Sequence, residues 1–542
     1  MSLTGALSVC AQVLWPCREA KRIIGSLGDR KNVVLETGFG ASGLPHIGTY
    51  GEIVRTEFVA LALKDFGCKP HIVSFLDDLD GLRKVPGGFP EWLRDFLGRP
   101  VSDIPDPFEC CESFSKHMHK VLVEMINEAG VNCEYVFSSE EYNRGTFNTA
   151  IERVMNNADA LTKMVVPTLS EEVGAKWFPF FVKCEKCGKL YTTRIESANV
   201  DLKTVDYVCD VEFGVVSGCG HRGTTSYLNG AGKLPWRVDW PARWFALNVD
   251  YEIHGKDLIE SASLGKLIMG RIFKKPPPQT MVYELFLSAD GSRISKSKGF
   301  GIDPTRWLKY GTRDSLHLML YKKPTQAKRL DLSRMPSYVN EAFDVAADFY
   351  RSPDGNREPG ERHPYEFLTL FRPPDPDPGR IDYATLCNLV AALGERDPAL
   401  IREYAAKLAD ENVSALPSSK SQIPSSELID GLVQKAIAFA DDVLTAQPAP
   451  ELELDDNEGQ AVRVFVDYLR SGEHTGEEIQ TKVFDLTRQH AIPQPRIFQI
   501  LYILILKQLE GPRLGEFISI LGLERTAERI EASLARVKEA RQ

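Results

Sequence analysis

No stretch of this sequence approaches the roughly eighteen uninterrupted apolar residues that a membrane-spanning helix needs, so we expect no transmembrane segment. Residues 1–20 lack a basic start followed by a long apolar run and a small-residue cleavage site, so no secretory signal is evident. The eleven cysteines show no regular spacing apart from one group between Cys184 and Cys219. A disulfide framework is therefore not indicated. These absences predict a protein of a reducing compartment, the cytoplasm.

The size and charge of the chain exclude little else. With 542 residues and a mass of 60.6 kDa, the chain exceeds what one hydrophobic core usually supports, so we expect two or three domains. The net charge of −10 argues against a surface that binds nucleic acid everywhere. A single track of lysine and arginine could still contact RNA.

The first part of the chain alternates between strand and helix patterns. Residues 32–36 read as a buried strand, the glycine-rich turn 38–48 follows, and a helical pattern continues to residue 66. A second apolar run, 71–76, ends in a loop that contains Asp77, Asp78 and Asp80. This alternation predicts an α/β, Rossmann-like parallel sheet whose strand ends carry the chemistry.

Composition divides the rest of the chain. A strand signal returns at Gln279–Ser288, and the segment 351–380 is dominated by proline, glycine and charge, as expected of a linker or surface crossing. Beyond it the pattern is almost wholly helical, with Leu428, Leu432, Ala436, Phe439 and Val443 on one face. The predicted parts are 1–164 and 236–290 (two halves of the sheet domain), 165–235 (an insertion), 291–350 (a loop and the region after it), 351–380 (the linker) and 381–542 (an all-α domain).

The glycine-rich turn is the first candidate for chemistry. It runs Thr37-Gly-Phe-Gly-Ala-Ser-Gly-Leu-Pro-His-Ile-Gly48 between a strand and a helix. Glycines let a ligand approach the backbone, and a helix N-terminus attracts phosphate. His46 can donate a hydrogen bond to the same anion. An ordinary turn with a structural histidine is an equal alternative, and the turn matches neither the Walker loop nor the dinucleotide fingerprint.

A second candidate is the loop Asp290-Gly-Ser-Arg-Ile-Ser-Lys-Ser-Lys-Gly299. Lys296 lies between Ser295 and Ser297, and a loop of this kind can close over a triphosphate and stabilise the charge on departing pyrophosphate. Taken alone, the same residues are also typical of a solvated basic turn.

Together, in this order and on this alternating pattern, the two loops resemble the paired signatures of class I aminoacyl-tRNA synthetases. Further segments narrow the resemblance to class I lysyl-tRNA synthetases: 77–86, 234–244, 254–257, 321–330 and 511–515. The sequence departs from the usual pattern at Ala41, Thr49, Arg293 and Ile294. Thr49 keeps a hydrogen-bond donor and Arg293 keeps a cation, so we expect the same chemistry.

The resemblance implies an enzyme that uses ATP to form lysyl-adenylate and then loads L-lysine onto tRNA(Lys). It implies catalytic roles for His46, Gly48, Ser295, Lys296 and Ser297. ATP would contact Ser42, Gly43, His46, Gly48, Thr49 and Lys296, and lysine would contact Gly38, Gly40, Trp236, Trp240, Asp257 and Tyr283. Mg²⁺ would accompany ATP, and Asp77, Asp78 and Asp80 could bind it, although helix caps or surface charges are commoner roles for such acids.

A structural zinc site is the third candidate. Cys184 and Cys187 have the spacing of a zinc knuckle, and Cys209, Cys219 and His221 follow within reach. We predict Cys184, Cys187, Cys209 and Cys219 as the four ligands, with His221 as the substitute. Such a site would stiffen the insertion without taking part in catalysis. Free buried cysteines are the alternative.

The remaining expectations concern tRNA and competing functions. The basic residues Lys322, Lys323, Lys328 and Arg329 could contact phosphates near the acceptor stem, or form a solvated turn. By resemblance, the helical part 381–542 would bind the anticodon. A class I synthetase for glutamate is one alternative, which would need an arginine such as Arg237 or Arg243 in the pocket. A noncatalytic tRNA-binding relative is the other.

Overall fold

A computed structural model describes residues 14–174, 177–288, 291–292, 304–351, 361–375, 379–394, 396–414, 425–444 and 450–539. Its centre is a five-stranded sheet with the order β10-β9-β1-β2-β3. The strands are β1 (Asn32–Phe39), β2 (Lys69–Leu76), β3 (Glu134–Phe137), β9 (Tyr251–Gly255) and β10 (Gln279–Tyr283). All neighbouring pairs are parallel. The predicted Rossmann-like sheet is therefore confirmed.

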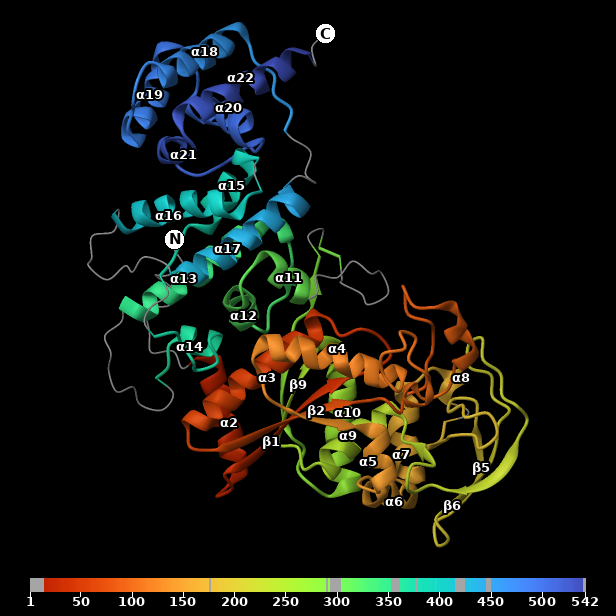
Figure 1. Cartoon of the computed structure of the whole chain (residues 1–542). Coiled ribbons are helices and arrows are strands. Elements are labelled where there is room, and N and C mark those ends of the chain that lie inside the picture. The colour runs from red at the N-terminus through yellow and green to blue at the C-terminus, as the bar shows by residue number, and fades with distance from the viewer. Residues whose placement is uncertain are drawn as a thin grey trace.

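Helices cover both faces of this sheet (Figure 1). Val33 and Leu35 of β1 are fully buried on one face, in a core shared with α2 (Trp15–Leu27), α3 (Ile47–Asp65) and α4 (Phe114–Ala129). Val73 and Phe75 of β2 face the other side. They share a second core with α6 (Asn148–Asn156), α9 (Trp236–Ala246) and α10 (Ile259–Ile268). β1 and β2 therefore carry buried apolar residues toward both faces of the sheet, as expected of a parallel sheet that is covered on both sides.

The segment between the two halves of this sheet carries short antiparallel strands. β4 (Phe181–Val182) pairs with β8 (Gly232–Lys233), and β5 (Arg194–Asn199), β6 (Thr204–Val208) and β7 (Arg222–Ser226) form a three-stranded sheet. The helices that lead into it are α5 (Ser138–Arg144), α7 (Ala158–Val165) and α8 (Glu171–Gly174). In Figure 1 this segment, in yellow, lies beside the parallel sheet and far from the C-terminal helices.

The strand expected at Gln279–Ser288 is two strands. β10 ends at Tyr283, the amide of Glu284 bonds to the carbonyl of Pro324 at 3.2 Å, and β11 (Phe286–Leu287) pairs with β12 (Lys328–Arg329) in a separate ribbon. The chain therefore leaves the main sheet just before the second candidate loop. The helices that follow are α11 (Pro304–Tyr310), α12 (Arg313–Tyr321) and α13 (Met335–Arg351).

Part of the segment expected to be a linker is packed. α14 (Pro364–Leu368) begins at a capping box formed by His363 and Glu366, and it buries Tyr365, Phe367 and Leu368. The ring of Phe367 lies 6.2 Å from Phe58 of α3. These three side chains therefore belong to the core. The prediction of a surface crossing came from the proline and charged residues that flank them.

The C-terminal part is helical, as predicted. It comprises α15 (Tyr383–Leu393), α16 (Pro398–Ser414), α17 (Ser426–Phe439), α18 (Asp456–Arg470), α19 (Gly476–Gln489), α20 (Gln494–Leu506), α21 (Leu514–Leu521) and α22 (Leu523–Glu539). Figure 1 shows α18 to α22 grouped at the end of the molecule remote from the parallel sheet. No helix among the described residues has the length and apolar character to cross a membrane.

Candidate active site

The site is built where the parallel strands end. In the register of β1 and β2, Gly38 lies opposite Phe75 and Phe39 opposite Leu76. The amide of Asp77 then bonds to the carbonyl of Phe39 at 2.9 Å. The glycine-rich turn and the acidic loop therefore leave the sheet at the same edge, as expected for a ligand site in an open α/β fold.

His46 is the N-cap of α3. Its Nδ1 accepts hydrogen bonds from the amides of Gly48 at 3.0 Å and Thr49 at 3.4 Å. An accepting Nδ1 assigns the proton of the neutral ring to Nε2, which can then donate. A Cβ on Gly48 would lie 2.7 Å from Cε1 of His46, so any larger residue would displace the imidazole. This explains why glycine stands two positions after the histidine.

A second feature joins the turn to the end of β10 through Glu52 of α3. Its Oε1 accepts from the amide of Gly38 at 3.1 Å, and its Oε2 accepts from the hydroxyl of Tyr283 at 2.9 Å. Burial, followed by repulsion from Glu252, raises the pKa of Glu52 to about 8. Gly38 and Tyr283 were predicted from the sequence, whereas Glu52, which connects them, was not.

Behind Gly38 lies a buried cluster with more carboxylates than cations. Nε of Arg243 lies 3.5 Å from Glu36 and 3.8 Å from Asp239, and all three side chains are at most 2% exposed. Glu252 accepts a hydrogen bond from Nε1 of Trp240 at 2.8 Å. Burial is the main cause that raises the pKa values of Glu36 and Glu252. A Cβ on Gly38 would come within 4.0 Å of both Arg243 and Glu252, so this cluster directly underlies the turn.

The predicted tryptophans have different environments. Trp236 is partly exposed and stacks on Trp240 with a centroid distance of 5.1 Å and an interplanar angle of 16°. Trp240 is 1% exposed and lies behind it, hydrogen-bonded to Glu252. Trp240 therefore supports Trp236 from the core, and the expected direct contact with lysine has no basis in this arrangement. The reason is that α9 packs on the sheet through its middle, which buries the residues from Val238 to Trp244 and leaves Trp236 partly exposed at its start.

The other predicted residues lie around the same edge. Asp257 is exposed, and a Cβ on Gly255 would lie 2.6 Å from its carboxylate and 3.6 Å from the hydroxyl of Tyr283, so the acid and the phenol are neighbours. Gly40 and Ser42 are exposed, Gly43 is partly exposed, and Thr49 is buried. Ser295, Lys296 and Ser297 lie outside the described residues.

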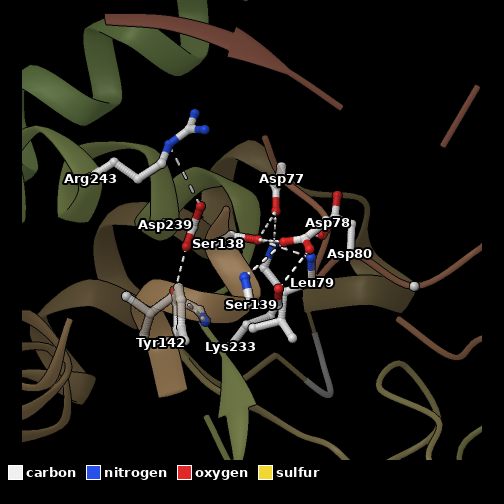
Figure 2. A network of polar contacts seen from close by, with 12 residues as sticks. Asp77, Asp78, Leu79, Asp80, Ser138, Ser139, Tyr142, Lys233, Asp239 and Arg243 are labelled. Atoms are coloured by element: carbon white, nitrogen blue, oxygen red, sulfur yellow. Dashed lines mark hydrogen bonds and ion pairs between the residues drawn. The ribbon is translucent and has the colours of Figure 1, made fainter. Parts of the chain in front are cut away.

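The acidic loop is part of a buried network (Figure 2). Nζ of Lys233, on β8, lies 2.8 Å from Asp77 and 2.6 Å from Asp80. Asp78 accepts hydrogen bonds from Ser138 and Ser139 at the start of α5, as a helix-capping acid does. Asp77 and Asp78 are 5% and 1% exposed, so the surface-charge alternative is wrong for these two. The sequence did not indicate that Lys233 of the insertion would be their partner.

We expect Lys233→Met to destabilise the protein. Burial lowers the pKa of Lys233, but the charges of Asp77 and Asp80 outweigh it and raise the pKa well above its usual value. Removing one partner of a buried ion pair typically costs about 3 to 5 kcal/mol because a buried charge is left uncompensated. The change in the free energy of unfolding is measured by urea denaturation monitored by fluorescence.

The matched control for Lys233 is Lys183→Met, also in the insertion. Lys183 lies 3.2 Å from Asp103, and the two side chains are 36% and 37% exposed. Exposed ion pairs are usually worth about 0 to 1 kcal/mol. Equal effects of the two substitutions would contradict the structural role of Lys233.

The chain is similar to known proteins over most of its length. The profile of the family described as tRNA synthetases class I (K) matches residues 13–367. The chain belongs to this family. A lysine–tRNA ligase from Cenarchaeum symbiosum is 33% identical over 512 residues, covering 93% of this chain and 95% of that protein. Another from Rickettsia felis is 34% identical over 532 residues, covering 96% and 97%. A solved glutamate tRNA ligase from Elizabethkingia meningosepticum overlaps 93% of this chain and 99% of its own, with 15% identity and a TM-score of 0.37.

In this class I synthetase the four predicted cysteines come together. The Sγ atoms of Cys184 and Cys219 are 3.7 Å apart, as are those of Cys187 and Cys209, and all four lie within 4.8 Å of one another. Tetrahedral zinc with bonds of about 2.3 Å separates its sulfur ligands by about 3.8 Å. His221 is not part of this group, and its Nε2 lies 3.9 Å from Glu185. The four cysteines can therefore hold a metal ion without it.

The basic residues expected to contact tRNA are only partly available. Lys322 forms an ion pair with Glu341, and Nζ of Lys328 bonds to the carbonyl of Lys322. Burial, followed by the charge of Arg55, lowers the pKa of Lys328 to about 8. Lys323 and Arg329 are exposed, so these two are the members of the group that present their charge to solvent.

Proposed function

We propose that the chain is a lysine–tRNA ligase, which forms lysyl-adenylate from L-lysine and ATP and transfers the lysyl group to tRNA(Lys). The observation that carries the choice of amino acid is the carboxylate of Glu52, held between Gly38 and Tyr283 at the strand ends. An ammonium group that leaves water needs a carboxylate or an aromatic face. Glu52 and the ring of Trp236 supply both.

The charge balance supports lysine over glutamate. Four buried carboxyl groups, those of Glu36, Glu52, Asp239 and Glu252, face two buried guanidiniums. Arg243 is engaged by Glu36 and Asp239, and Arg55 lies 5.1 Å from the ring centre of Tyr283, where the charge of Glu52 attracts it. An acidic substrate would add a further carboxylate to this surplus, whereas a lysine side chain would neutralise part of it. Arg243 is therefore not free to bind the side-chain carboxylate of a glutamate substrate.

The chemistry of adenylate formation needs no general base. The substrate carboxylate is already ionised at neutral pH and attacks the α-phosphate of ATP directly. Nε2 of His46 and the N-terminus of α3 would hold the phosphate, with Ser42, Gly43 and the backbone of Gly48 and Thr49 beside it. Lys296, flanked by Ser295 and Ser297, would stabilise the leaving pyrophosphate, and Mg²⁺ would enter bound to ATP. Catalysis is then positioning and charge stabilisation.

Amino-acid-dependent pyrophosphate exchange tests the assignment. The purified chain is incubated with ATP and labelled pyrophosphate, and each of lysine and glutamate is added in turn. Exchange that requires lysine, followed by transfer of labelled lysine to tRNA(Lys), is the expected result. Exchange with glutamate would identify the other class I enzyme, and absence of exchange with every amino acid would identify a noncatalytic relative.

We expect the KM for lysine to rise as the pH falls. Glu52, with its pKa raised to about 8 by burial, attracts an ammonium group only when ionised. Lysine should therefore bind more tightly as the pH rises toward about 8, and below that value each pH unit lowers the ionised fraction by about tenfold. In Glu52→Gln the profile should flatten. Glu36 and Glu252 remain in that variant, so the difference between the two profiles isolates Glu52. A KM for lysine that is the same at about pH 8 and at lower pH would show that Glu52 does not bind the ammonium group.

We further propose that Cys184, Cys187, Cys209 and Cys219 bind structural zinc. All four ligand positions would be filled by thiolates, which is typical of a closed site that stabilises a fold. The ion would fix the small sheets of the insertion. Exposed Lys323 and Arg329 would contact tRNA phosphates, and the helices α15 to α22 would bind the anticodon end.

A further inference from the structure

Arg55, on the helix α3, is a buried cation that the proposed chemistry does not use. Its side chain is 0% exposed, and its Nε donates a hydrogen bond to the carbonyl of Leu320 at 3.2 Å. Among the described residues, Nη1 and Nη2 of Arg55 have no hydrogen-bond partner. A buried guanidinium that is only partly satisfied costs stability, and proteins keep such costs mainly where function requires them. Arg55 is therefore a candidate for a role in the site.

Two aromatic rings lie against the guanidinium of Arg55. Its Cζ lies 5.1 Å from the ring centre of Tyr283 and 5.4 Å from the ring centre of Phe286. Gly51 provides the space, since a Cβ on it would lie 3.3 Å from Phe286 and 3.4 Å from Nη1 of Arg55. The faces of aromatic rings attract cations, most strongly when both groups are out of water. The guanidinium is thus held where the chain passes from β10 to β11.

Tyr283 connects Arg55 to the carboxylate of Glu52. The ring of Tyr283 contacts the guanidinium, and its hydroxyl donates a hydrogen bond to Oε2 of Glu52 at 2.9 Å. Glu52 and Arg55 are three positions apart on α3, a spacing that places side chains on the same face of a helix. Because one ring makes both contacts, a shift of that ring away from Arg55 would also change its hydrogen bond to Glu52.

The charges around Glu52 and Arg55 favour each other's charged form. Burial lowers the pKa of Arg55 to about 10, and the charges of Tyr283 and Glu52 oppose this effect, so Arg55 is protonated at neutral pH. The attraction is reciprocal, so this cation favours the ionised form of Glu52. Lys328 of β12 also faces Arg55. The other groups that face Glu52 are Glu36 of β1, Glu252 of β9, Tyr283 of β10 and Arg243 of α9.

We propose that Arg55 is a positioning residue for lysine binding, whose guanidinium holds the ring of Tyr283 against Glu52 and supplies a fixed positive charge beside that carboxylate. The inference rests on the proposed function, because it requires that Glu52 binds the substrate ammonium. Since Arg55 is fully buried, it acts through Tyr283 and Glu52 and does not touch the substrate.

The pH dependence of the KM for lysine in Arg55→Met tests the proposal. Methionine fills much of the same space without the charge. Glu52 should then ionise about one pH unit higher, so the KM for lysine should rise about tenfold at pH 7 and only about twofold at pH 9. The KM for ATP should stay at its wild-type value, since His46 is untouched. Arg55→Lys keeps a cation and should restore the wild-type pH dependence.

Stability separates this role from a purely structural one. An apolar side chain in place of a buried, partly satisfied charge is often neutral or stabilising, so Arg55→Met should resist urea at least as well as wild type. Arg362→Met is the matched control. Arg362 also contacts α3, through an ion pair with Asp65, and lies 5.0 Å from the ring centre of Phe371. Its loss should leave the KM for lysine unchanged at every pH.

The possible outcomes are distinct. A wild-type pH dependence of the KM for lysine in Arg55→Met would overturn the inference and leave the proposed function standing. A less stable Arg55→Met whose KM for lysine rises equally at every pH would also overturn it, because that is the result of a purely structural role. If the wild-type chain does not activate lysine at all, the proposed function fails and the inference fails with it.

Discussion

Replacing Glu52 with glutamine is expected to lower kcat/KM for lysine by about thirtyfold to several thousandfold, because loss of one partner of a desolvated charge pair typically costs about 2 to 5 kcal/mol. Glutamine has nearly the same shape and can still accept from the amide of Gly38, which Glu52 does at 3.1 Å. The substitution therefore removes charge while the turn stays in place. The KM for ATP should be unchanged, since His46 and the N-terminus of α3 are untouched.

Glu57 provides the matched control, on the same helix. It is 8% exposed and lies 4.0 Å from Lys64, away from Gly38 and Tyr283. Glu57→Gln should leave the lysine kinetics at wild-type values. Tyr283→Phe removes only a hydrogen bond to a charged group, worth about 1.5 to 3 kcal/mol, so it should have a smaller effect than Glu52→Gln. A lysine kcat/KM in Glu52→Gln equal to that of wild type would show that the ammonium binds elsewhere.

Lys296→Ala is expected to lower lysyl-adenylate formation by about two to three orders of magnitude, the usual effect of losing one preorganised donor to a developing charge. The loss should fall on kcat, because charge on pyrophosphate grows as it leaves and is small in bound ATP. Single-turnover formation of lysyl-adenylate measures the step directly.

Lys298→Ala is the control for Lys296, since it removes the same charge two positions further along the same loop. If Lys296 acts at the leaving group, Lys298→Ala should retain most of the activity. Near-normal pyrophosphate exchange in Lys296→Ala would refute the role. Equal losses in the two variants would instead mean that the loop contributes its overall charge rather than one placed ammonium group.

The sequence predicted the features that depend on neighbours along the chain. The strand, glycine turn and helix at 32–65 follow one another, so periodicity and glycine content identify them. Cys184 and Cys187 are similarly close in sequence. Their distant partners, Cys209 and Cys219, were found because few other ligands were within reach.

The features that the sequence did not reveal depend on contacts between distant segments. Glu52 lies among apolar helix residues, and only the folded chain brings it to Tyr283, 231 positions away. An isolated glutamate in an apolar strand, as with Glu36 and Glu252, was a signal that could have been used. Trp236 and Trp240 are four positions apart and share a helix face. The packing of α9 decides which one is accessible, and periodicity carries no information about that.

The ion pair between Lys233 and the strand-end acids has a consequence for any attempt to shorten this enzyme. Lys233 comes from the insertion, while Asp77 follows β2 of the parallel sheet, so the two parts of the chain supply opposite charges to one buried contact. Excising residues 165–235 would take away the cation and leave Asp77 facing Asp80. Burial and the charge of Asp80 already raise the pKa of Asp77 to about 6. A trimmed version would therefore need both acids changed to neutral residues, such as asparagine, before its catalytic half could fold alone.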